Sequence, residues 1–191
     1  MPARTRLIKQ ALIIFAITFL GFFAARTLNG TDTPRYELSN SVDLSKDGIA
    51  TNNRLTGEQL PNIELENVDG ETTSTKSLLG TPTILNIWYS TCEPCRRELP
   101  VLASAAARYR DQVRFVGVNI KDSASVAEQF AVQYGVKFEL LFDTKGLFIS
   151  QLGIATAPVT LAVDAQGKII EQIAGEISAN KLNELVSELL K

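Results

Sequence analysis

Residues 83–100 read TILNIWYSTCEPCRRELP, and this stretch decides the fold. An apolar run rich in β-branched and aromatic residues ends at Ser90 and Thr91 and gives way to a segment of helical character. This pattern predicts a buried strand followed directly by a helix. Cys92 and Cys95, the only cysteines of the chain, lie at the amino end of that helix. A CxxC pair placed directly after a strand in an α/β pattern indicates redox chemistry.

The position of Cys92 favours a thiolate. The first turn of a helix has unpaired backbone N–H groups and a partial positive charge, and both stabilise an anion there. We therefore expect a lowered pKa for the Cys92 thiol and attack by Cys92 on a disulfide of a partner. Cys95, one turn further on, would resolve the mixed disulfide and close an intramolecular ring.

Two other interpretations of the cysteine pair are open. Half of a zinc site would need two more soft ligands, but the chain has no histidine and no other cysteine. A purely structural disulfide that closes so short a loop would constrain the unfolded chain little. Redox chemistry is therefore the favoured interpretation, and we expect no metal site.

Length and charge limit the classes of protein. The chain has 191 residues with 45% hydrophobic content, which suits one domain with extensions. Residues 1–26 carry four basic residues and no acid, so the remainder holds 15 basic against 21 acidic residues, a net charge of −6. An acidic body of this kind predicts that nucleic acid is not a partner. Without histidine, proton transfer falls to carboxylates, amines, thiols or water.

The amino terminus predicts export and attachment to a membrane. Residues 11–25 form an uncharged apolar run with three positive residues before it and one after it. A helix over residues 7–27 would be about 31 Å long, close to the thickness of a bilayer core. We expect residues 1–27 to be a single-pass anchor in the cell membrane, with a cleavable signal peptide as the alternative. The charge bias places the body outside the cytoplasm, on the periplasmic or outer face.

The rest of the chain predicts one α/β domain after a linker. Residues 28–59 are polar and predict a flexible linker. Residues 60–191 alternate strand and helix patterns, with a parallel strand pair joined by a right-handed crossover and a helix capped by Ser125. The expected elements are a hairpin over 60–75, strands over 84–89, 113–120 and 138–142, helices over 95–109, 125–135 and 147–152, a hairpin over 159–174 and an amphipathic helix over 182–190.

Residues 60–191 resemble the thioredoxin superfamily and, within it, the TlpA/ResA-like membrane-anchored thiol–disulfide oxidoreductases. The sharpest part of the resemblance is LNIWYSTCEPCRRELP, in which CEPC is the ResA-type active-site sequence and Pro100 falls where the family has its helix-kinking proline. The resemblance implies a thioredoxin-like fold, with a central mixed β-sheet flanked by helices. An N-terminal β-hairpin and an inserted strand–helix element would complete it.

Several site residues carry over from the resemblance. Pro158 matches the cis-proline that faces the CxxC pair and helps to present the substrate backbone. Glu98 matches the acidic residue that assists proton transfer, whereas its plain alternative is a solvated helix carboxylate. Asn86 stands where classical thioredoxin has a buried aspartate, which makes Glu98 the expected buried acid.

The residues around the cysteines complete the expected site. Glu93 and Pro94 would set the redox poise. The resemblance predicts a substrate groove that is lined by Trp88, Thr91, Ala157 and Pro158. Thr91 and the residue after the proline, Val159, depart from the family pattern, and both departures bear on partner specificity.

The resemblance implies an extracytoplasmic thiol–disulfide oxidoreductase that reduces protein disulfides. Apocytochrome c is a candidate substrate through cytochrome c maturation, with general redox homeostasis as another role. A membrane thiol reductant would recharge the protein, and no cofactor is expected beyond the Cys92–Cys95 disulfide. The alternatives are a peroxiredoxin-like peroxidase and a non-catalytic thioredoxin-fold binding or sensor module. A peroxidase would need Thr or Ser where this chain has Tyr89.

Overall fold

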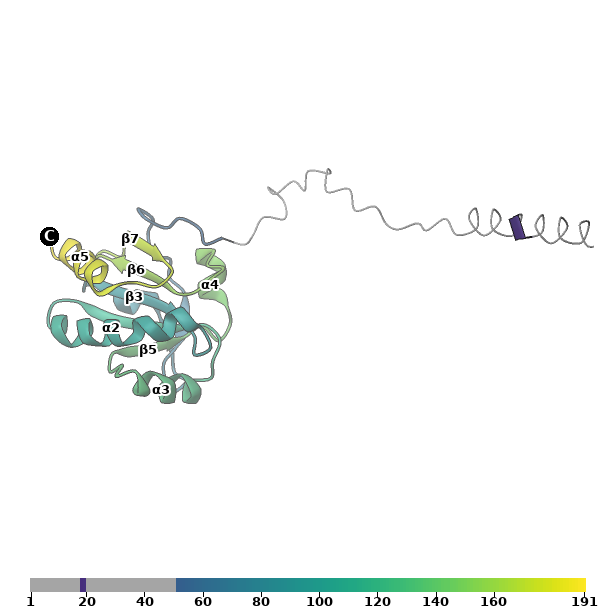
Figure 1. Ribbon diagram of the computed structural model, residues 1–191. Helices are drawn as coiled ribbons and strands as arrows, with labels where there is room; N and C mark the ends of the chain where they lie inside the picture. The colour runs from purple at the N-terminus through teal and green to yellow at the C-terminus, as the bar shows by residue number, and fades with distance from the viewer. Residues whose placement is uncertain (1–17, 20–50) are drawn as a thin grey trace, which may run out of the picture. The chain divides into compact units, whose positions relative to one another are not determined.

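The computed structural model describes residues 18–19 and 51–191. Thr18 and Phe19 are helical and belong to the expected anchor, but the rest of residues 1–27 and residues 28–50 of the expected linker lie outside the described residues. Within the two described ranges, no helix is long and apolar enough to cross a membrane. The body of the protein is the part from residue 51 onward (Figure 1).

A seven-stranded mixed sheet forms the centre of the body, in the order β2-β1-β5-β4-β3-β6-β7 (Figure 1). Strands β3, β4 and β5 run parallel, whereas β6 is antiparallel to β3 and β7 is antiparallel to β6. Because β3 is paired on both sides and covered on both faces, all its residues are buried, as its apolar sequence predicts. The strands are β1 Glu64–Glu66, β2 Thr72–Ser74, β3 Thr83–Trp88, β4 Arg114–Asn119, β5 Glu139–Phe142, β6 Val159–Val163 and β7 Ile169–Ala174.

Helices cover both faces of the sheet. Alternate residues of β3 point to opposite faces, so Leu85 and Ile87 join one core while Ile84 and Trp88 join the cores on the other face. Helices α2, α3 and α5 pack on the face that carries Ile84 and Trp88, and η1 and α4 pack on the opposite face. The helices are η1 Thr75–Leu78, α2 Glu93–Tyr109, α3 Ala124–Gln133, α4 Leu147–Leu152 and α5 Ala179–Leu189.

The expected N-terminal hairpin and inserted strand–helix element are both present, and they meet. Strands β1 and β2 form the antiparallel hairpin, and β5 with α4 stands between α3 and β6 in the chain. Strand β5 pairs in parallel with β4 and also, through Phe142 and Glu66, with β1. The inserted strand therefore connects the hairpin to the central sheet.

The start of α3 differs from the prediction. Ser125 was expected to cap this helix, but the cap is Ser123, whose hydroxyl accepts a hydrogen bond from the Val126 N–H. The buried face consists of Ala127 and Ala131, whereas Val126 is 50% exposed. Small alanine side chains let this helix lie close to the sheet. The spacing of the larger apolar residues in the sequence does not indicate this buried face.

The packed body begins before the expected boundary at Leu60. Leu55 is buried in the core, and the N–H of Gly57 donates to the carbonyl of Ile169 at 2.7 Å. We call residues 51–59 the N-terminal strap, because they run along the start of β7 instead of forming the last part of a linker. Their partners lie over a hundred positions later in the chain, so local composition could not predict this packing.

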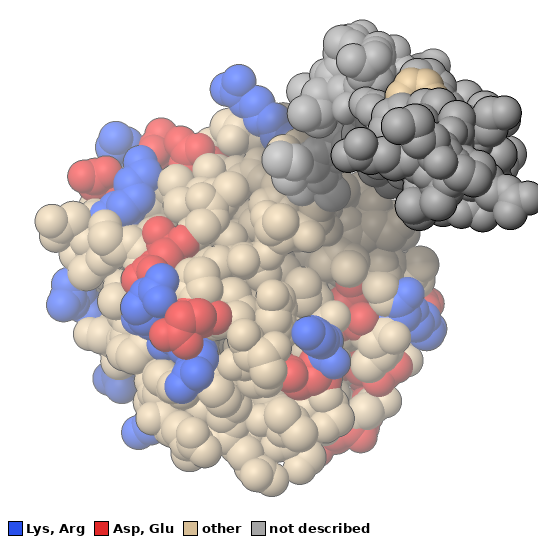
Figure 2. Space-filling view, turned by 45° about the vertical axis from the view of Figure 1, so that its right-hand side comes forward, with Lys and Arg blue, Asp and Glu red and all other residues tan. Residues whose placement is uncertain are grey.

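Charges of both signs are interspersed on the surface of the body. Figure 2 shows lysine and arginine side chains next to aspartate and glutamate, with uncharged surface between them. Arg114 pairs with Glu139 at 2.6 Å, and Lys145 pairs with Glu64 at 3.2 Å. The Lys145–Glu64 pair is exposed, and pairs of that kind contribute little to stability, on the order of 0 to 1 kcal/mol. The face in this view carries no extended stripe of one sign.

Candidate active site

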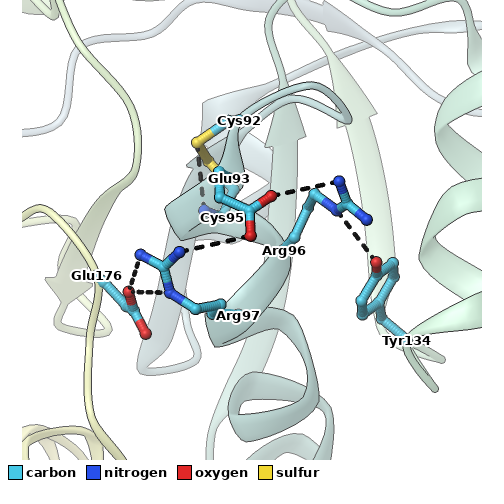
Figure 3. Close-up of polar contacts among 7 residues, drawn as sticks. All are labelled: Cys92, Glu93, Cys95, Arg96, Arg97, Tyr134 and Glu176. Carbon is cyan, nitrogen blue, oxygen red and sulfur yellow. Dashed lines mark hydrogen bonds and ion pairs between the residues drawn. A yellow bond between two sulfur atoms is a disulfide. The ribbon is translucent and has the colours of Figure 1, made fainter.

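Cys92 and Cys95 form a disulfide at the amino end of α2 (Figure 3). Cys92 is the N-cap residue, and its Sγ accepts a hydrogen bond from the Cys95 N–H at 3.2 Å. Pro94 occupies the first turn, where a backbone N–H would have no partner within the helix. Pro94 has no N–H to donate, and within this turn it is the Cys95 N–H that donates to the Cys92 sulfur. After reduction, the same donor and the helix dipole would stabilise a thiolate on Cys92.

The two sulfurs differ in their access to solvent. Cys92 is 4% exposed, whereas Cys95 is fully buried. Of the two cysteines, only Cys92 therefore has any surface open to a partner disulfide. This difference supports the expected order of events, in which Cys92 attacks and Cys95 resolves.

Charged side chains surround the first turn of α2. Figure 3 shows Glu93 between Arg96 and Arg97, with which it forms ion pairs at 3.3 and 3.5 Å. Arg97 also binds Glu176, on the loop between β7 and α5, with its Nη2 at 2.7 Å. Arg96 donates from Nε to the Tyr134 hydroxyl at 3.2 Å. The two guanidinium groups offset the negative charge of Glu93 beside the disulfide. The electrostatic field at the cysteines therefore depends on all three side chains.

Glu98 lies one turn beyond Cys95 on α2 and is fully buried. Its Oε1 accepts a hydrogen bond from the Asn86 side-chain amide at 2.8 Å, and its Oε2 accepts one from the Ile177 N–H at 2.9 Å. The same amide of Asn86 donates to the Thr160 hydroxyl at 3.1 Å. Residues three apart on a helix share a face, so Glu98 lies on the side of α2 that Cys95 buries against the sheet.

Burial raises the pKa of Glu98 to about 7, from an ordinary value of 4.5. The hydrogen bonds from Ile177 and Asn86 favour the ionised form and limit the shift, while the charge of Glu176 adds to it. A carboxyl that titrates near neutral pH can both accept and release a proton during thiol exchange. The prediction that Glu98 is the buried acid is therefore confirmed in position, and its role in proton transfer stays a prediction.

The expected groove residues separate into two groups. Thr91 is exposed beside Cys92, and Ala157, half-buried, packs against the cluster that contains both cysteines. The Ala157–Pro158 bond is cis, as the resemblance implied, and Pro158 is buried. Of the four expected groove residues, Thr91 and Ala157 are thus the ones with exposed surface.

Trp88 does not line the groove, contrary to the prediction. Its side chain is 0% exposed and stacks on Phe130 of α3 at a centroid distance of 6.0 Å. Gly117 on β4 leaves the space for it, since a Cβ there would lie 2.9 Å from the indole Nε1. As the last residue of β3, Trp88 packs in the cluster that also contains Ala127 of α3 and both cysteines.

A cluster of polar residues that the sequence analysis did not single out holds this loop. The Asp122 carboxylate accepts hydrogen bonds from the Ser90 N–H and hydroxyl, both at 2.7 Å, and from the Asn119 side-chain amide at 2.8 Å. Burial acts to raise the pKa of Asp122, but these hydrogen bonds and the charge of Lys121 outweigh it, so the pKa lies below its ordinary value. The result is a fixed connection between the β4–α3 loop and the loop before Cys92.

We expect Asp122→Ala to weaken this connection and lower the free energy of unfolding by roughly 1 to 2 kcal/mol, because it removes charge-assisted hydrogen bonds. Because the folded-state pKa of Asp122 is lowered, the stabilisation is present above its unfolded pKa and is lost as the pH falls through the folded value. Urea denaturation at pH 7 and at pH 3 would measure both effects.

Asp111→Ala is the matched control for this prediction. Asp111 pairs with Arg110 at 3.7 Å with both side chains strongly exposed. The control should therefore unfold at nearly the urea concentration of the wild type. Equal stability of Asp122→Ala and Asp111→Ala would contradict the role assigned to the cluster.

Some of these partners had a signal in the sequence. Asn119 and Asp122 end or follow a strand parallel to β3, and the carboxyl ends of neighbouring parallel strands meet at one edge of a sheet. Thr160 is a polar residue within an apolar strand, a pattern that predicts a buried hydrogen bond. Ile177, in contrast, contributes only a backbone N–H, which no side-chain pattern could indicate.

The arrangement defines a class of protein. A disulfide at the amino end of a helix that follows the central strand of a mixed sheet, with a proline loop packed beside it, is the site of a thioredoxin-fold thiol–disulfide oxidoreductase. The chain belongs to the AhpC/TSA family, whose model matches residues 56–172.

Known relatives agree with this class. Thiol-disulfide oxidoreductase ResA of Bacillus subtilis (strain 168) is 27% identical over 153 residues, which cover 80% of this chain and 83% of that protein. ResA of Halalkalibacterium halodurans is 32% identical over 137 residues, which cover 71% of this chain and 77% of that protein. The crystal structure of StoA from Bacillus subtilis is 28% identical in sequence and superposes on this chain with a TM-score of 0.56. The match covers 66% of this chain and 96% of the StoA chain. The protein is thus an enzyme, a thiol–disulfide oxidoreductase of the ResA type.

Proposed function

We propose that this enzyme reduces disulfides of partner proteins outside the cytoplasm. Cys92 attacks the partner disulfide and forms a mixed disulfide, and Cys95 then attacks Cys92, releases the reduced partner and closes the ring. Glu98 takes up and returns the proton that the buried Cys95 exchanges during this cycle. Glu93 and Pro94 set the poise of the pair, with Arg96 and Arg97 moderating the charge of Glu93.

The observation that carries this proposal is the asymmetry of the cysteine pair. Cys92 is at the helix N-cap and keeps 4% of its surface exposed, whereas Cys95 is fully buried. A structural disulfide needs no such difference, but an enzyme that first binds a partner covalently and then releases it does. Thr91, next to Cys92 in the chain, and Ala157, which packs against the cluster of the two cysteines, provide surface that a partner would contact.

The location of the reaction is proposed from the amino-terminal sequence. The uncharged run over residues 11–25, with its positive flank, supports a single-pass anchor or an export signal at residues 1–27. A dithiol in an oxidising compartment needs a supply of electrons, so we propose a membrane thiol reductant as donor. Apocytochrome c is the proposed substrate by resemblance, and the disulfide itself is the only redox group that the cycle requires.

The reduction potential of the Cys92–Cys95 couple tests the proposal. The full-length protein is equilibrated with thiol buffers, and free thiols are trapped and counted. We expect a value near or below about −230 mV, as for thiol reductants. A value near about −120 mV would mark an oxidant and contradict the proposed direction.

Two further outcomes correspond to the alternatives. The absence of any reversible couple would favour a binding or sensor module. Rapid consumption of hydrogen peroxide by the reduced protein, with slow exchange with protein disulfides, would favour the peroxidase. We expect neither outcome, and parallel assays with insulin and with hydrogen peroxide as electron acceptors would measure both.

A further inference from the structure

A single side chain of the N-terminal strap binds the loop beside the disulfide. The Asn52 Oδ1 accepts hydrogen bonds from the N–H groups of Ala155 at 2.7 Å and Thr156 at 2.8 Å. The Asn52 Nδ2 donates to the carbonyl and to the hydroxyl of Thr156, both at 3.1 Å. Asn52 thus uses both ends of its amide on two consecutive residues of one loop.

The loop that Asn52 binds leads directly to the site. Ala155 and Thr156 are exposed, and the next residue, Ala157, packs against the cluster that contains Cys92 and Cys95. Exposed residues of a loop have little packing to fix their backbone, so they depend on hydrogen bonds for order. The N–H groups of Ala155 and Thr156 both donate to Asn52, so this side chain helps to order the backbone of the loop.

The strap is itself held firmly, so it can fix the position of the loop. Leu55 is buried in the core, and its N–H donates to the side chain of Gln172 at 2.8 Å. Gln172 also donates to the carbonyl of Asn53 at 3.0 Å, and the Asn53 N–H donates to the carbonyl of Gly153 at 2.9 Å. Asn52 is therefore presented from a segment that is anchored on β7 and at the end of α4.

We propose that Asn52 is a positioning residue for partner binding, which holds residues 155–157 in the conformation that a protein disulfide contacts when it reaches Cys92. This inference rests on the proposed function and adds a determinant of affinity to it. Cys92 is only 4% exposed, so a bulky partner must lie against the surface beside it in order to bring its own sulfur into reach. A small disulfide can reach Cys92 without that contact, and the two kinds of substrate should respond differently to loss of Asn52.

The test compares Asn52→Ala with wild type in the full-length protein. For reduction of insulin, we expect the KM to rise roughly tenfold at little change in kcat, because binding must then order the loop backbone. The rate with the small disulfide 5,5′-dithiobis(2-nitrobenzoate) and the reduction potential should not change. Amide hydrogen exchange at Ala155 and Thr156 should become faster.

Two variants make the comparison specific. Asn53→Ala removes the neighbouring side chain, which makes no hydrogen bond among the described residues, and should behave as wild type. Asn52→Asp keeps the acceptor for the two N–H groups but loses the donor to Thr156, so its KM should rise only about threefold. If Asn52→Ala does not fold, Asn52→Asp becomes the test. An Asn52→Asp variant with the KM of the wild type and the same rate of amide exchange at Thr156 would overturn the inference.

The failure of the inference and the failure of the proposed function can be distinguished. A wild type that reduces insulin, with an Asn52→Ala variant of equal KM, overturns the role of Asn52 alone. An equal loss of rate with insulin and with the small disulfide also overturns it, because the effect would then lie at the cysteines. A wild type that exchanges with neither disulfide overturns both.

Discussion

Replacing Cys92 with serine should abolish reduction of protein disulfides, with a loss of at least about a thousandfold in rate. A serine hydroxyl does not form a disulfide with a partner, and Cys95 cannot substitute because it is fully buried. The fold should persist, since serine suits the N-cap position and can accept the hydrogen bond that the Cys95 N–H now donates to sulfur. Insulin reduction by the wild type and the variant, at equal folded concentration, would measure the loss.

Cys95→Ser is the matched control for that result. This variant keeps the accessible sulfur but lacks the resolving one, so it should attack a partner and stay bound to it. We expect a stable mixed disulfide, visible on a non-reducing gel, instead of turnover. If Cys92→Ser were the variant that accumulates the mixed disulfide, the order of attack inferred from exposure would be reversed.

Glu98→Gln should remove a pH dependence from the stability of the protein. Burial raises the folded-state pKa of Glu98 to about 7, above the ordinary value of 4.5, so between these values the folded state holds a proton that the unfolded state has released. Stability is therefore greatest below the unfolded pKa and falls as the pH rises through the folded one. The shift corresponds to roughly 2 to 3 kcal/mol between pH 5 and pH 8.

Urea denaturation at several pH values would test this prediction. The wild type should lose that amount of unfolding free energy relative to Glu98→Gln as the pH is raised. Glu128→Gln on α3 serves as control, because Glu128 is exposed, and its stability should follow that of the wild type at every pH. If the unfolding free energies of the wild type and Glu98→Gln changed with pH in the same way, a raised pKa at Glu98 would be contradicted.

The same substitution should slow catalysis near neutral pH. A glutamine cannot take up or release a proton, so we expect the rate of thiol exchange at pH 7 to fall roughly tenfold to a hundredfold. Mixed disulfide should still form, since Cys92 is intact. An unchanged rate across pH 6 to pH 8 would show that Glu98 is a structural acid only.

The neighbourhood of Glu98 shows how far sequence reasoning reaches. The family resemblance matched Glu98 to an acidic site residue and Asn86 to the buried aspartate of thioredoxin, which made Glu98 the expected buried acid, and the structure buries it against that asparagine. The partners Thr160 and Ile177 come from β6 and from the loop before α5, far along the chain. Burial and these two contacts determine the pKa, so its value depends on elements that the local sequence does not contain.

Trp88 shows the opposite outcome. The family resemblance placed it in the substrate groove, yet its side chain stacks on Phe130 of α3 and fills the space that Gly117 leaves. A strand alternates its side chains between two faces, and only the packing of helices on each face decides which of them is covered.

The sequence by itself determined the strand–helix unit with its CxxC pair, the two hairpins and the later strands and helices, and its resemblance to a known family supplied the thioredoxin-like class of fold. These features depend on local periodicity, on turn residues and on a motif within one short stretch. Only the tertiary structure decided that Asp122 holds the loop before Cys92, that Glu98 titrates near neutral pH, and that Asn52 binds the loop beside the disulfide. Each of these depends on hydrogen bonds or burial between segments distant in the chain, which form only when the sheet has brought them together.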